Sequence, residues 1–433
     1  MPFFHDERDW FFQKRYGMFI HWGLYSIAGY HEQEIFRKGI ARKEYEAYAN
    51  RFNPVRFNAE QWLDLLQQAG MEYVVFTTKH LDGFCMWDTK YTDFSIMNTP
   101  YGKDILKELA DACHRRNIPL LLYYCIIDTH HPNYPNQGRA YEYPCPQEGD
   151  SPNLPAYIEY VRGQVRELCT NYGKISGFFW DANIPGYYDE SINDMIRELQ
   201  PSAVINGRGF DEGDYNTPER EFEEQNIRAL RHFKTPTEAC QSLGMQSWGY
   251  REEEDYYSTK YIMQCIDRTL SMGGNYLLNV GPRADGTIDP RSADRLLVIA
   301  HWFQKVKESY YNAVPASDPI QDPGLFATVK GTDVYLHLWK DAIGDSIEVV
   351  PLTSLPESAI LLNTGQELIC KRDQGNKDWR AMPEYVRIRN IPVERCYDQV
   401  LVIKLTYRVL PMMFRSIEVS LTPPVRGIQG KDF

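Results

Sequence analysis

The chain has 433 residues, with 47 lysines and arginines against 59 aspartates and glutamates, which gives a formal net charge of −12. Such a length exceeds one ordinary hydrophobic core, so a large domain plus a smaller one is expected. The negative charge argues against nucleic acid and anionic membranes as partners, because neither is attracted to such a field.

The first part of the chain carries seven apolar runs that predict buried strands. These runs cover residues 18–21, 73–80, 119–124, 175–181, 203–206, 239–243 and 275–280. Apolar residues at three- and four-residue spacing predict helices between the strands, at 59–69, 104–116, 156–170, 190–199, 259–272 and 291–308. The alternation predicts an α/β fold, a (β/α)8-like, TIM-type barrel over residues 1–314. An eighth repeat is not evident, so we expect the barrel to be irregular.

The sequence pattern changes after Tyr310. Helical spacing gives way to short alternating runs punctuated by Pro, Gly and Asp, at 325–330, 333–339, 346–350, 359–362, 386–389 and 399–405. This sequence pattern predicts a C-terminal antiparallel β-sandwich domain over residues 315–433.

The nine cysteines lie between Cys85 and Cys396 without any CxxC pair, which is typical of free thiols in a reducing compartment. Charged residues 6–9 interrupt the apolar core that a signal peptide would need. We therefore expect a cytoplasmic protein, with no membrane as a partner.

The run Ile175–Asp181, ISGFFWD, predicts a buried strand that ends in a carboxylate, just before a turn containing Pro185 and Gly186. Barrel enzymes carry their chemistry at the carboxyl ends of strands, so Asp181 is our candidate reactive group. The alternative is a structural aspartate that caps a helix. Polar and aromatic residues also follow the other predicted strands, namely His21, His80, Trp87, Tyr124, Arg208 and Trp248. An arginine would hold a neighbouring carboxylate ionised, and neutral histidines can bind sugar hydroxyls.

Glycoside hydrolysis needs a second carboxyl group that protonates the leaving oxygen. Glu219 is the first choice for this acid/base and Glu238 the second. Glu221, Glu223 and Glu224 form a charge cluster typical of solvated surface.

No cofactor or metal site is predicted. His130 and His131 stand beside Asp128, but without further spaced ligands they are weak evidence for a metal. No HExxH, P-loop or GxGxxG context occurs.

These residues together resemble the α-L-fucosidases of glycoside hydrolase family 29. The resemblance runs from Trp10 to Tyr310, through GMFIHWGLYS, TKH, DGFCMWD, FFWD, INGR, DYNTPE, SWGY and GGNYLLNVGPRADG, in that order. It implies a retaining exo-glycosidase that removes terminal α-L-fucose through a covalent glycosyl-enzyme, on a (β/α)8-like barrel with a C-terminal β-sandwich and without a metal.

The resemblance implies a role for individual residues. Asp181 matches the nucleophile, and the acid/base is left to Glu219 or Glu238. The positions expected around the sugar are His21, Glu34, His80, Trp87, Tyr124, Arg208 and Trp248. Three residues depart from the family pattern: Leu81 replaces a second histidine, Ile35 replaces a tryptophan, and Thr129 replaces another tryptophan.

We therefore predict an α-L-fucosidase that acts on a fucosylated oligosaccharide or glycoconjugate. One alternative is a glycosidase for a related, galactoside-like sugar, since the two sugars differ mainly at C5. The other is a sugar-binding relative with impaired catalysis, in which Leu81 and Ile35 reflect the loss of site residues that the family usually carries. A homo-oligomer, in which another subunit donates an aromatic residue, is left open.

Overall fold

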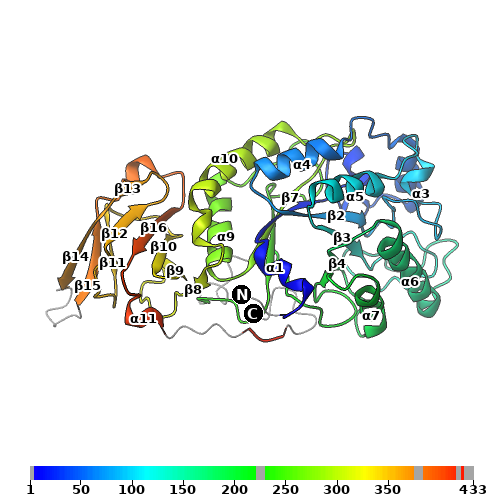
Figure 1. Cartoon of the computed structure of the whole chain (residues 1–433). Coiled ribbons are helices and arrows are strands. Elements are labelled where there is room, and N and C mark those ends of the chain that lie inside the picture. Colours follow the sequence, from blue (N-terminus) through cyan, green and yellow to red (C-terminus); the bar gives the residue numbers. More distant parts are fainter. Residues whose placement is uncertain (1–3, 221–229, 375–383, 416–420, 424–433) are drawn as a thin grey trace.

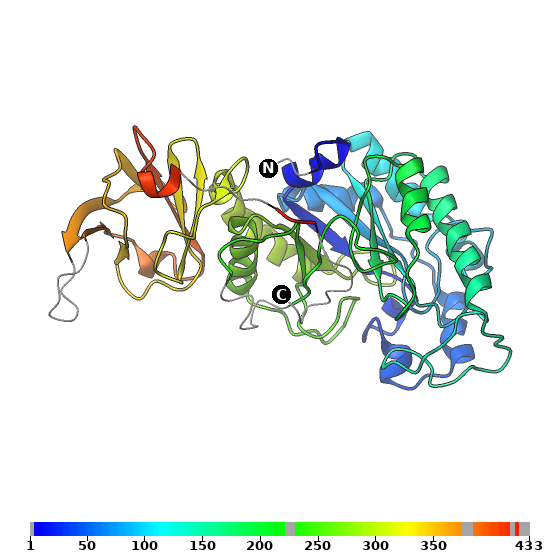
Figure 2. The same cartoon turned by 90° about the horizontal axis from the view of Figure 1, so that it is seen from below.

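A computed structural model describes residues 4–220, 230–374, 384–415 and 421–423. Figures 1 and 2 show two units side by side, a barrel-like unit and a smaller sandwich that carries the yellow-to-red part of the chain. One large cluster of buried apolar residues fills the first unit, and a separate cluster fills the sandwich. The predicted combination of an α/β barrel and an antiparallel β-sandwich is confirmed.

The barrel sheet has seven parallel strands in the order β5-β4-β3-β2-β1-β7-β6. Their bounds are β1 Tyr16–Ile20, β2 Tyr73–Lys79, β3 Leu120–Cys125, β4 Gly177–Asp181, β5 Val204–Ile205, β6 Glu238–Ser242 and β7 Asn275–Val280. Each predicted strand overlaps one of these. Because the strands are parallel, their carboxyl ends meet at one edge of the sheet.

Residues 215–220 occupy the position between the two edge strands of this sheet. Tyr215 forms a bridge with Asn206, directly after β5, and Glu219 forms a bridge with Cys240 of β6. These contacts are isolated bridges instead of a continuous ladder, and the segment has no apolar strand pattern. The eighth repeat was invisible in the sequence for this reason, and the barrel is irregular as expected.

Six long helices described in the barrel domain cover the outside of the sheet (Figure 1). Their bounds are α4 Ala59–Gln68, α5 Ile105–Arg116, α6 Leu154–Asn171, α7 Glu190–Leu199, α9 Thr259–Ser271 and α10 Pro290–Val306. Each begins after a residue whose side-chain oxygen accepts a backbone N–H of the first turn, which satisfies an otherwise unpaired donor. These caps are Asn58, Asp104, Asn153, Asp189, Ser258 and Asp289. None of the described helices is long and apolar enough to cross a bilayer.

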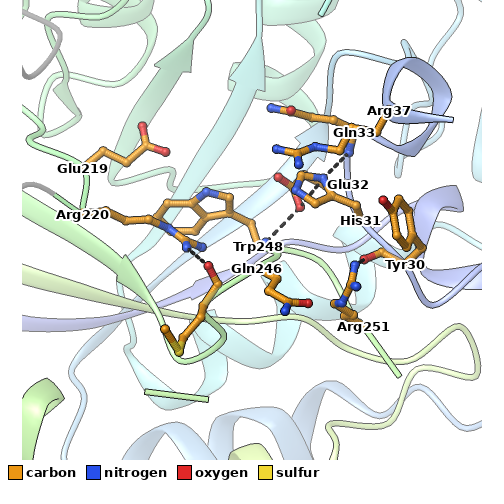
Figure 3. A pocket seen from close by; sticks show the side chains of 11 residues that line it. Tyr30, His31, Glu32, Gln33, Arg37, Glu219, Arg220, Gln246, Trp248 and Arg251 are labelled. Atoms are coloured by element: carbon orange, nitrogen blue, oxygen red, sulfur yellow. Dashed lines mark hydrogen bonds and ion pairs between the residues drawn. The ribbon is translucent and has the colours of Figure 1, made fainter. Parts of the chain in front are cut away.

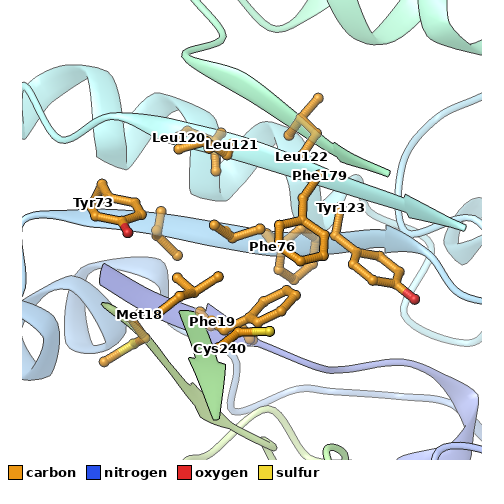
Figure 4. Packing of buried hydrophobic residues seen from close by; sticks show 14 of the residues in the cluster. Met18, Phe19, Tyr73, Phe76, Leu120, Leu121, Leu122, Tyr123, Phe179 and Cys240 are labelled. Atoms are coloured by element: carbon orange, nitrogen blue, oxygen red, sulfur yellow. The ribbon is translucent and has the colours of Figure 1, made fainter. Parts of the chain in front are cut away.

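Aromatic side chains fill the interior of the barrel below the site (Figure 4). Phe19 of β1 packs on Phe179 of β4 with ring centroids 5.0 Å apart, and on Tyr123 of β3 at 5.8 Å. Side chains alternate between the two faces of a strand, so the residues adjacent to these three face the helices. The interior is therefore a packed core that supports the strand ends from below.

The sandwich consists of two sheets, in the orders β13-β12-β16-β10-β9-β8 and β11-β15-β14. Its strands are β8 Val314–Pro315, β9 Leu325–Lys330, β10 Asp333–Leu338, β11 Ser346–Val349, β12 Ser358–Leu361, β13 Gln366–Glu367, β14 Ile369–Gln374, β15 Glu384–Arg389 and β16 Leu401–Thr406. The strands β8, β13 and β14 were not predicted, because β8 and β13 have only two residues each and β14 is largely polar and exposed.

Buried polar contacts join the sandwich to the barrel. His337 of β10 bonds through Nδ1 to Oδ1 of Asp267 on α9 at 2.7 Å, with both side chains fully buried. Trp302 of α10 donates its indole N–H to the carbonyl of Val400 at 2.9 Å. The sandwich thus supports the helices on the outside of the barrel, away from the strand ends.

Candidate functional site

Asp181 is the last residue of β4 and stands at the carboxyl edge of the sheet. Its Oδ2 accepts a hydrogen bond from the phenol of Tyr123 at 2.7 Å, and Arg208 Nη1 lies 3.2 Å from Oδ1. The side chain is 28% exposed, so a ligand can reach the carboxylate. The cap of the following helix is Asp189. The helix-cap alternative for Asp181 is therefore wrong.

Arg208 joins Asp181 to Glu219. Its Nη1 donates to Oε2 of Glu219 at 3.0 Å as well as to Asp181. The rest of the guanidinium is fixed by Thr217, whose hydroxyl accepts from Nε at 2.6 Å and whose carbonyl accepts from Nη2 at 2.7 Å. Burial alone would lower the pKa of Arg208, but the two carboxylates raise it overall. This arginine is a fixed positive charge between two acids.

The Arg208 contacts also limit the separation of the two carboxylates. Both lie within 3.2 Å of one nitrogen atom, so their nearest oxygens cannot be farther apart than the sum of the two distances. Retaining glycosidases hold their two carboxyl groups about 5 to 5.5 Å apart, and inverting ones roughly 6.5 to 9.5 Å. The arrangement of Asp181 and Glu219 fits the short separation.

His21 is a neutral hydrogen-bonding group beside the carboxylates. Asn279 donates through Nδ2 to the carbonyl of Trp248 at 2.7 Å, so its Oδ1 accepts the 2.7 Å bond from Nδ1 of His21. This assigns the ring proton to Nδ1 and leaves Nε2 as an acceptor. Burial, with His80 close by, lowers the pKa of His21 to about 3. The ring is therefore uncharged at neutral pH.

His80, directly after the end of β2, lies beside His21 and forms one wall of the site with it. Its ring stacks on Tyr123 with centroids 5.7 Å apart and planes 13° apart, and it meets His21 edge-on at 5.9 Å. Nδ1 of His80 is buried and has no hydrogen-bond partner among the described residues. A buried polar atom without a partner is costly, and a ligand hydroxyl would satisfy it.

Trp248 and Glu32 lie next to His21. The Trp248 ring lies 5.2 Å from His21, and its backbone N–H donates to Oε2 of Glu32 at 2.9 Å (Figure 3). The hydroxyl of Ser247 donates to the same oxygen at 2.8 Å. Glu32 was missed in the sequence, although its place in the HEQE motif, twelve residues after the end of β1, was a usable signal.

The prediction of Glu34 as a sugar contact is wrong. Glu34 opens the short helix α2, Glu34–Arg37, and its fully buried carboxylate lies 3.4 Å from the ammonium group of Lys38 in the next turn.

The predictions of Tyr124 and Trp87 as sugar contacts are also wrong. Tyr124 donates its hydroxyl to Oε1 of Gln164 on α6 at 2.6 Å, so it faces the helix layer. Trp87 is fully buried next to Tyr124, with ring centroids 6.5 Å apart. The residue that reaches the nucleophile is Tyr123, on the opposite face of β3.

Glu238, the second choice for the acid/base, lies at the wrong end of the barrel. It is the first residue of β6, pairs in register with Asn275 at the start of β7, and accepts a hydrogen bond from Tyr73 at the start of β2. Catalytic groups of barrel enzymes occupy the opposite, carboxyl ends. Glu238 is fully buried and is excluded as the acid/base.

The buried position of Glu238 predicts a pH-dependent stability. Burial raises the pKa of this carboxyl from 4.5 to about 7, and the bond from Tyr73 only partly offsets the effect. Its stabilising effect is therefore complete below pH 4.5 and is lost as the pH rises through 7, by roughly 3 kcal/mol at about 1.4 kcal/mol per pKa unit. We expect Glu238→Gln, which stays neutral, to unfold in urea with a flatter pH dependence than the wild type between pH 5 and 8. Parallel curves for the two proteins would contradict the prediction.

Two of the three departures from the family pattern are neighbours in the structure. The carbonyl of Leu81 accepts both the backbone N–H and the hydroxyl of Thr129, each at 3.0 Å. These bonds tie the loop after β2 to the loop after β3. Ile35, the third departure, is buried in the barrel core.

The described residues hold no group of three His, Cys, Asp or Glu side chains placed to bind a metal ion. His130 instead bonds through Nδ1 to Oε1 of Glu46 at 2.6 Å. Of the acidic cluster, Glu221, Glu223 and Glu224 lie outside the described residues.

Comparison with known proteins gives one consistent family. The family model described as alpha-L-fucosidase matches residues 5–308. The tissue alpha-L-fucosidase of Macaca fascicularis is 27% identical over 422 residues, covering 89% of this chain and 84% of its own length.

Solved structures agree with this. Alpha-L-fucosidase isoenzyme 1 from Paenibacillus thiaminolyticus is 33% identical with a TM-score of 0.78, over 93% of this chain and 98% of that one. An alpha-L-fucosidase GH29 from Bacteroides thetaiotaomicron, described as a trapped covalent intermediate, is 26% identical with a TM-score of 0.75, over 94% and 97%. The chain belongs to the α-L-fucosidase family, glycoside hydrolase family 29.

Proposed function

We propose that the protein hydrolyses terminal α-L-fucosides of fucosylated glycans by double displacement, with Asp181 as nucleophile and Glu219 as acid/base. The observation that carries the proposal is the shared contact of both carboxylates with Nη1 of Arg208. It brings Asp181 at the end of β4 and Glu219 of the segment 215–220 to the short distance that double displacement requires. The covalent intermediate trapped in the Bacteroides relative supports the same reaction class.

In the first step an Asp181 oxygen forms a bond to the anomeric carbon as the glycosidic bond breaks. Glu219 gives its proton to the departing oxygen, so its contact with Arg208 is exchanged for one with the substrate. In the second step Glu219 takes a proton from water, and the water oxygen displaces Asp181 from the anomeric carbon. Arg208 and the phenol of Tyr123 hold Asp181 as an oriented anion before the first step.

The sugar ring has several possible partners beside the carboxylates. Nε2 of His21 is an acceptor, Nδ1 of His80 lacks a protein partner among the described residues, and Trp248 offers an apolar ring face. The neutral imidazole of His21 can bind a hydroxyl group without adding positive charge next to an oxocarbenium-like transition state.

The direct test is hydrolysis of a 4-nitrophenyl α-L-fucoside followed by proton NMR. We expect α-L-fucose as the first product, before mutarotation, and much slower release from the aryl β-D-galactoside. A β-configured first product would contradict double displacement. Faster galactoside hydrolysis would favour the related-sugar alternative, and binding of fucose without turnover would favour the non-catalytic one.

Removing the phenol of Tyr123 should impair catalysis without unfolding the protein. Hydrogen bonds to charged groups are worth about 1.5 to 3 kcal/mol, so we expect Tyr123→Phe to lower kcat roughly ten- to a hundredfold. The matched control is Tyr124→Phe, which loses only the bond to Gln164 in the helix layer. We expect it to change kcat less than about twofold and to cost about 1 kcal/mol of unfolding free energy. Equal kinetic effects of the two substitutions would contradict the placement of Tyr123.

A further inference from the structure

A hollow of about 600 Å³ is lined by Glu32, Glu219 and Trp248 of the site and by further residues that the proposed reaction does not use (Figure 3). Glu219 links this hollow to Asp181, since it lines the hollow and bonds to Arg208, which also bonds to Asp181. Trp248 contacts a site residue and a hollow residue, with the His21 ring 5.2 Å from its own ring and Arg220 4.7 Å over it. The hollow therefore begins at Glu219, the residue that would protonate the glycosidic oxygen.

Three arginines line this hollow, namely Arg37, Arg220 and Arg251. Arg220 donates from Nη1 to the carbonyl of Met245 at 2.7 Å, and Arg251 donates from Nη1 to the carbonyl of Tyr30 at 3.0 Å. Among the described residues, no carboxylate lies within ion-pair distance of any of the three. Arg220 and Arg251 also contact ring faces, those of Trp248 and Tyr30, and Glu254 interacts electrostatically with both from beyond ion-pair distance.

The two acids that line the hollow do not neutralise these arginines. Oε2 of Glu32 accepts from Ser247 and from the backbone N–H of Trp248. Glu219 is paired with Arg208. The hollow is therefore locally cationic, whereas the whole chain has a net charge of −12.

Arg220 carries two further features. It adopts a left-handed backbone conformation, with φ of 54°, directly after Glu219. Its Nε is buried without a hydrogen-bond partner among the described residues. An unfavourable backbone conformation and an unpaired buried donor persist only where the surrounding structure imposes them, and both are common at binding sites.

We propose that this hollow binds an acidic group on the aglycone, so that the preferred substrates are anionic fucosylated glycans carrying a carboxylate or a sulfate ester next to the fucosylated sugar. The proposal rests on the proposed function, because Glu219 can protonate the glycosidic oxygen only if the aglycone lies beside it. The planar guanidinium fork matches the oxygens of both carboxylate and sulfate.

The test compares neutral and anionic forms of one substrate. The neutral form is the fucosyl-oligosaccharide that the wild-type enzyme hydrolyses fastest in a panel of linkages. The anionic forms carry either a sulfate ester or a sialic acid on the adjacent galactose, which separates the two sources of charge. We expect the better anionic form to have about tenfold higher kcat/KM than the neutral one at low salt. The advantage should shrink as sodium chloride is added.

Variants then assign this advantage to the hollow. Arg220→Gln and Arg251→Gln should each reduce the anionic-to-neutral ratio, and the triple variant with Arg37→Gln should bring it close to one. The matched control is Arg51→Gln, since Arg51 is exposed and lies 4.9 Å over the ring of Tyr48, away from the hollow. We expect this control to leave both substrates unchanged.

Two outcomes would overturn the proposal: an anionic substrate hydrolysed no better than its neutral counterpart, or a preference that survives in the triple variant. Hydrolysis of the simple aryl fucoside is measured in every protein. If that reaction is also absent in the wild type, the proposed function fails. If it is present, only the anionic-aglycone proposal fails.

Discussion

Replacing Asp181 with asparagine is expected to lower kcat/KM for an aryl α-L-fucoside by at least about a thousandfold. The amide cannot attack the anomeric carbon as an anion, and it loses the charge that pairs with Arg208. Fluorescence and urea unfolding should show a folded protein, because Asp181 is partly exposed at the end of β4 and caps no helix. The measurement is initial-rate kinetics under identical conditions.

Chemical rescue separates a nucleophile from a merely structural residue. In Asp181→Gly, azide can occupy the space of the lost carboxylate and attack the anomeric carbon, so we expect a β-L-fucosyl azide, of inverted configuration. The control is Asp194→Asn, on the exposed side of α7, which should keep wild-type rates. Undiminished hydrolysis by Asp181→Asn would show that another group attacks.

Replacing Glu219 with alanine should give the second-largest effect, and one that depends on the leaving group. General acid catalysis typically contributes 10² to 10⁴ in rate. A natural oligosaccharide, whose leaving oxygen needs a proton, should therefore lose about that factor. A 2,4-dinitrophenyl fucoside leaves without protonation, so its first step should be nearly unchanged while the second step slows and KM falls.

Azide also shows whether Glu219 acts as the general acid/base or has only a structural role. With Glu219→Ala it should attack the glycosyl-enzyme without needing a general base and give an α-L-fucosyl azide, of retained configuration. The control is Glu44→Ala on α3, Arg42–Glu46, where the side chain is exposed. Equal losses for good and poor leaving groups would argue against Glu219 as the acid/base.

Much of the site could be predicted from the sequence because parallel strands bring their carboxyl ends together. Asp181, His21, His80 and Arg208 each follow an apolar run, and the structure brings them together. Glu219 was favoured because a short loop after Arg208 could return to the site, and residues 215–220 do so. The same rule could have excluded Glu238, which stands before the predicted run at 239–243.

The error at Tyr124 has a physical cause. Every residue of β3 is buried, because the strand is covered by the barrel interior on one face and by helices on the other. Because neither face of the strand is polar, the sequence does not indicate which residues point into the barrel and which point toward the helices. An error of one residue therefore assigns every side chain to the wrong face. A register shift between Thr77 and Lys79 in the neighbouring strand disturbs the phase further.

The error at Glu34 arose in a loop. Glu32 and Glu34 belong to one short motif, and no periodic element fixes which of them faces the site. Only the bonds of Glu32 to Ser247 and Trp248, more than 200 residues away in the chain, decide it. Contacts of this range cannot be inferred from local pattern.

Mechanism-based labelling shows whether Asp181 forms a covalent bond to the sugar. The wild-type protein is incubated with a 2-deoxy-2-fluoro-fucosyl fluoride, digested, and analysed by tandem mass spectrometry. We expect one fluorofucosyl group per chain, attached to Asp181 and absent from Asp181→Asn. A label on any other carboxylate, or full turnover of substrates with no adduct, would contradict it.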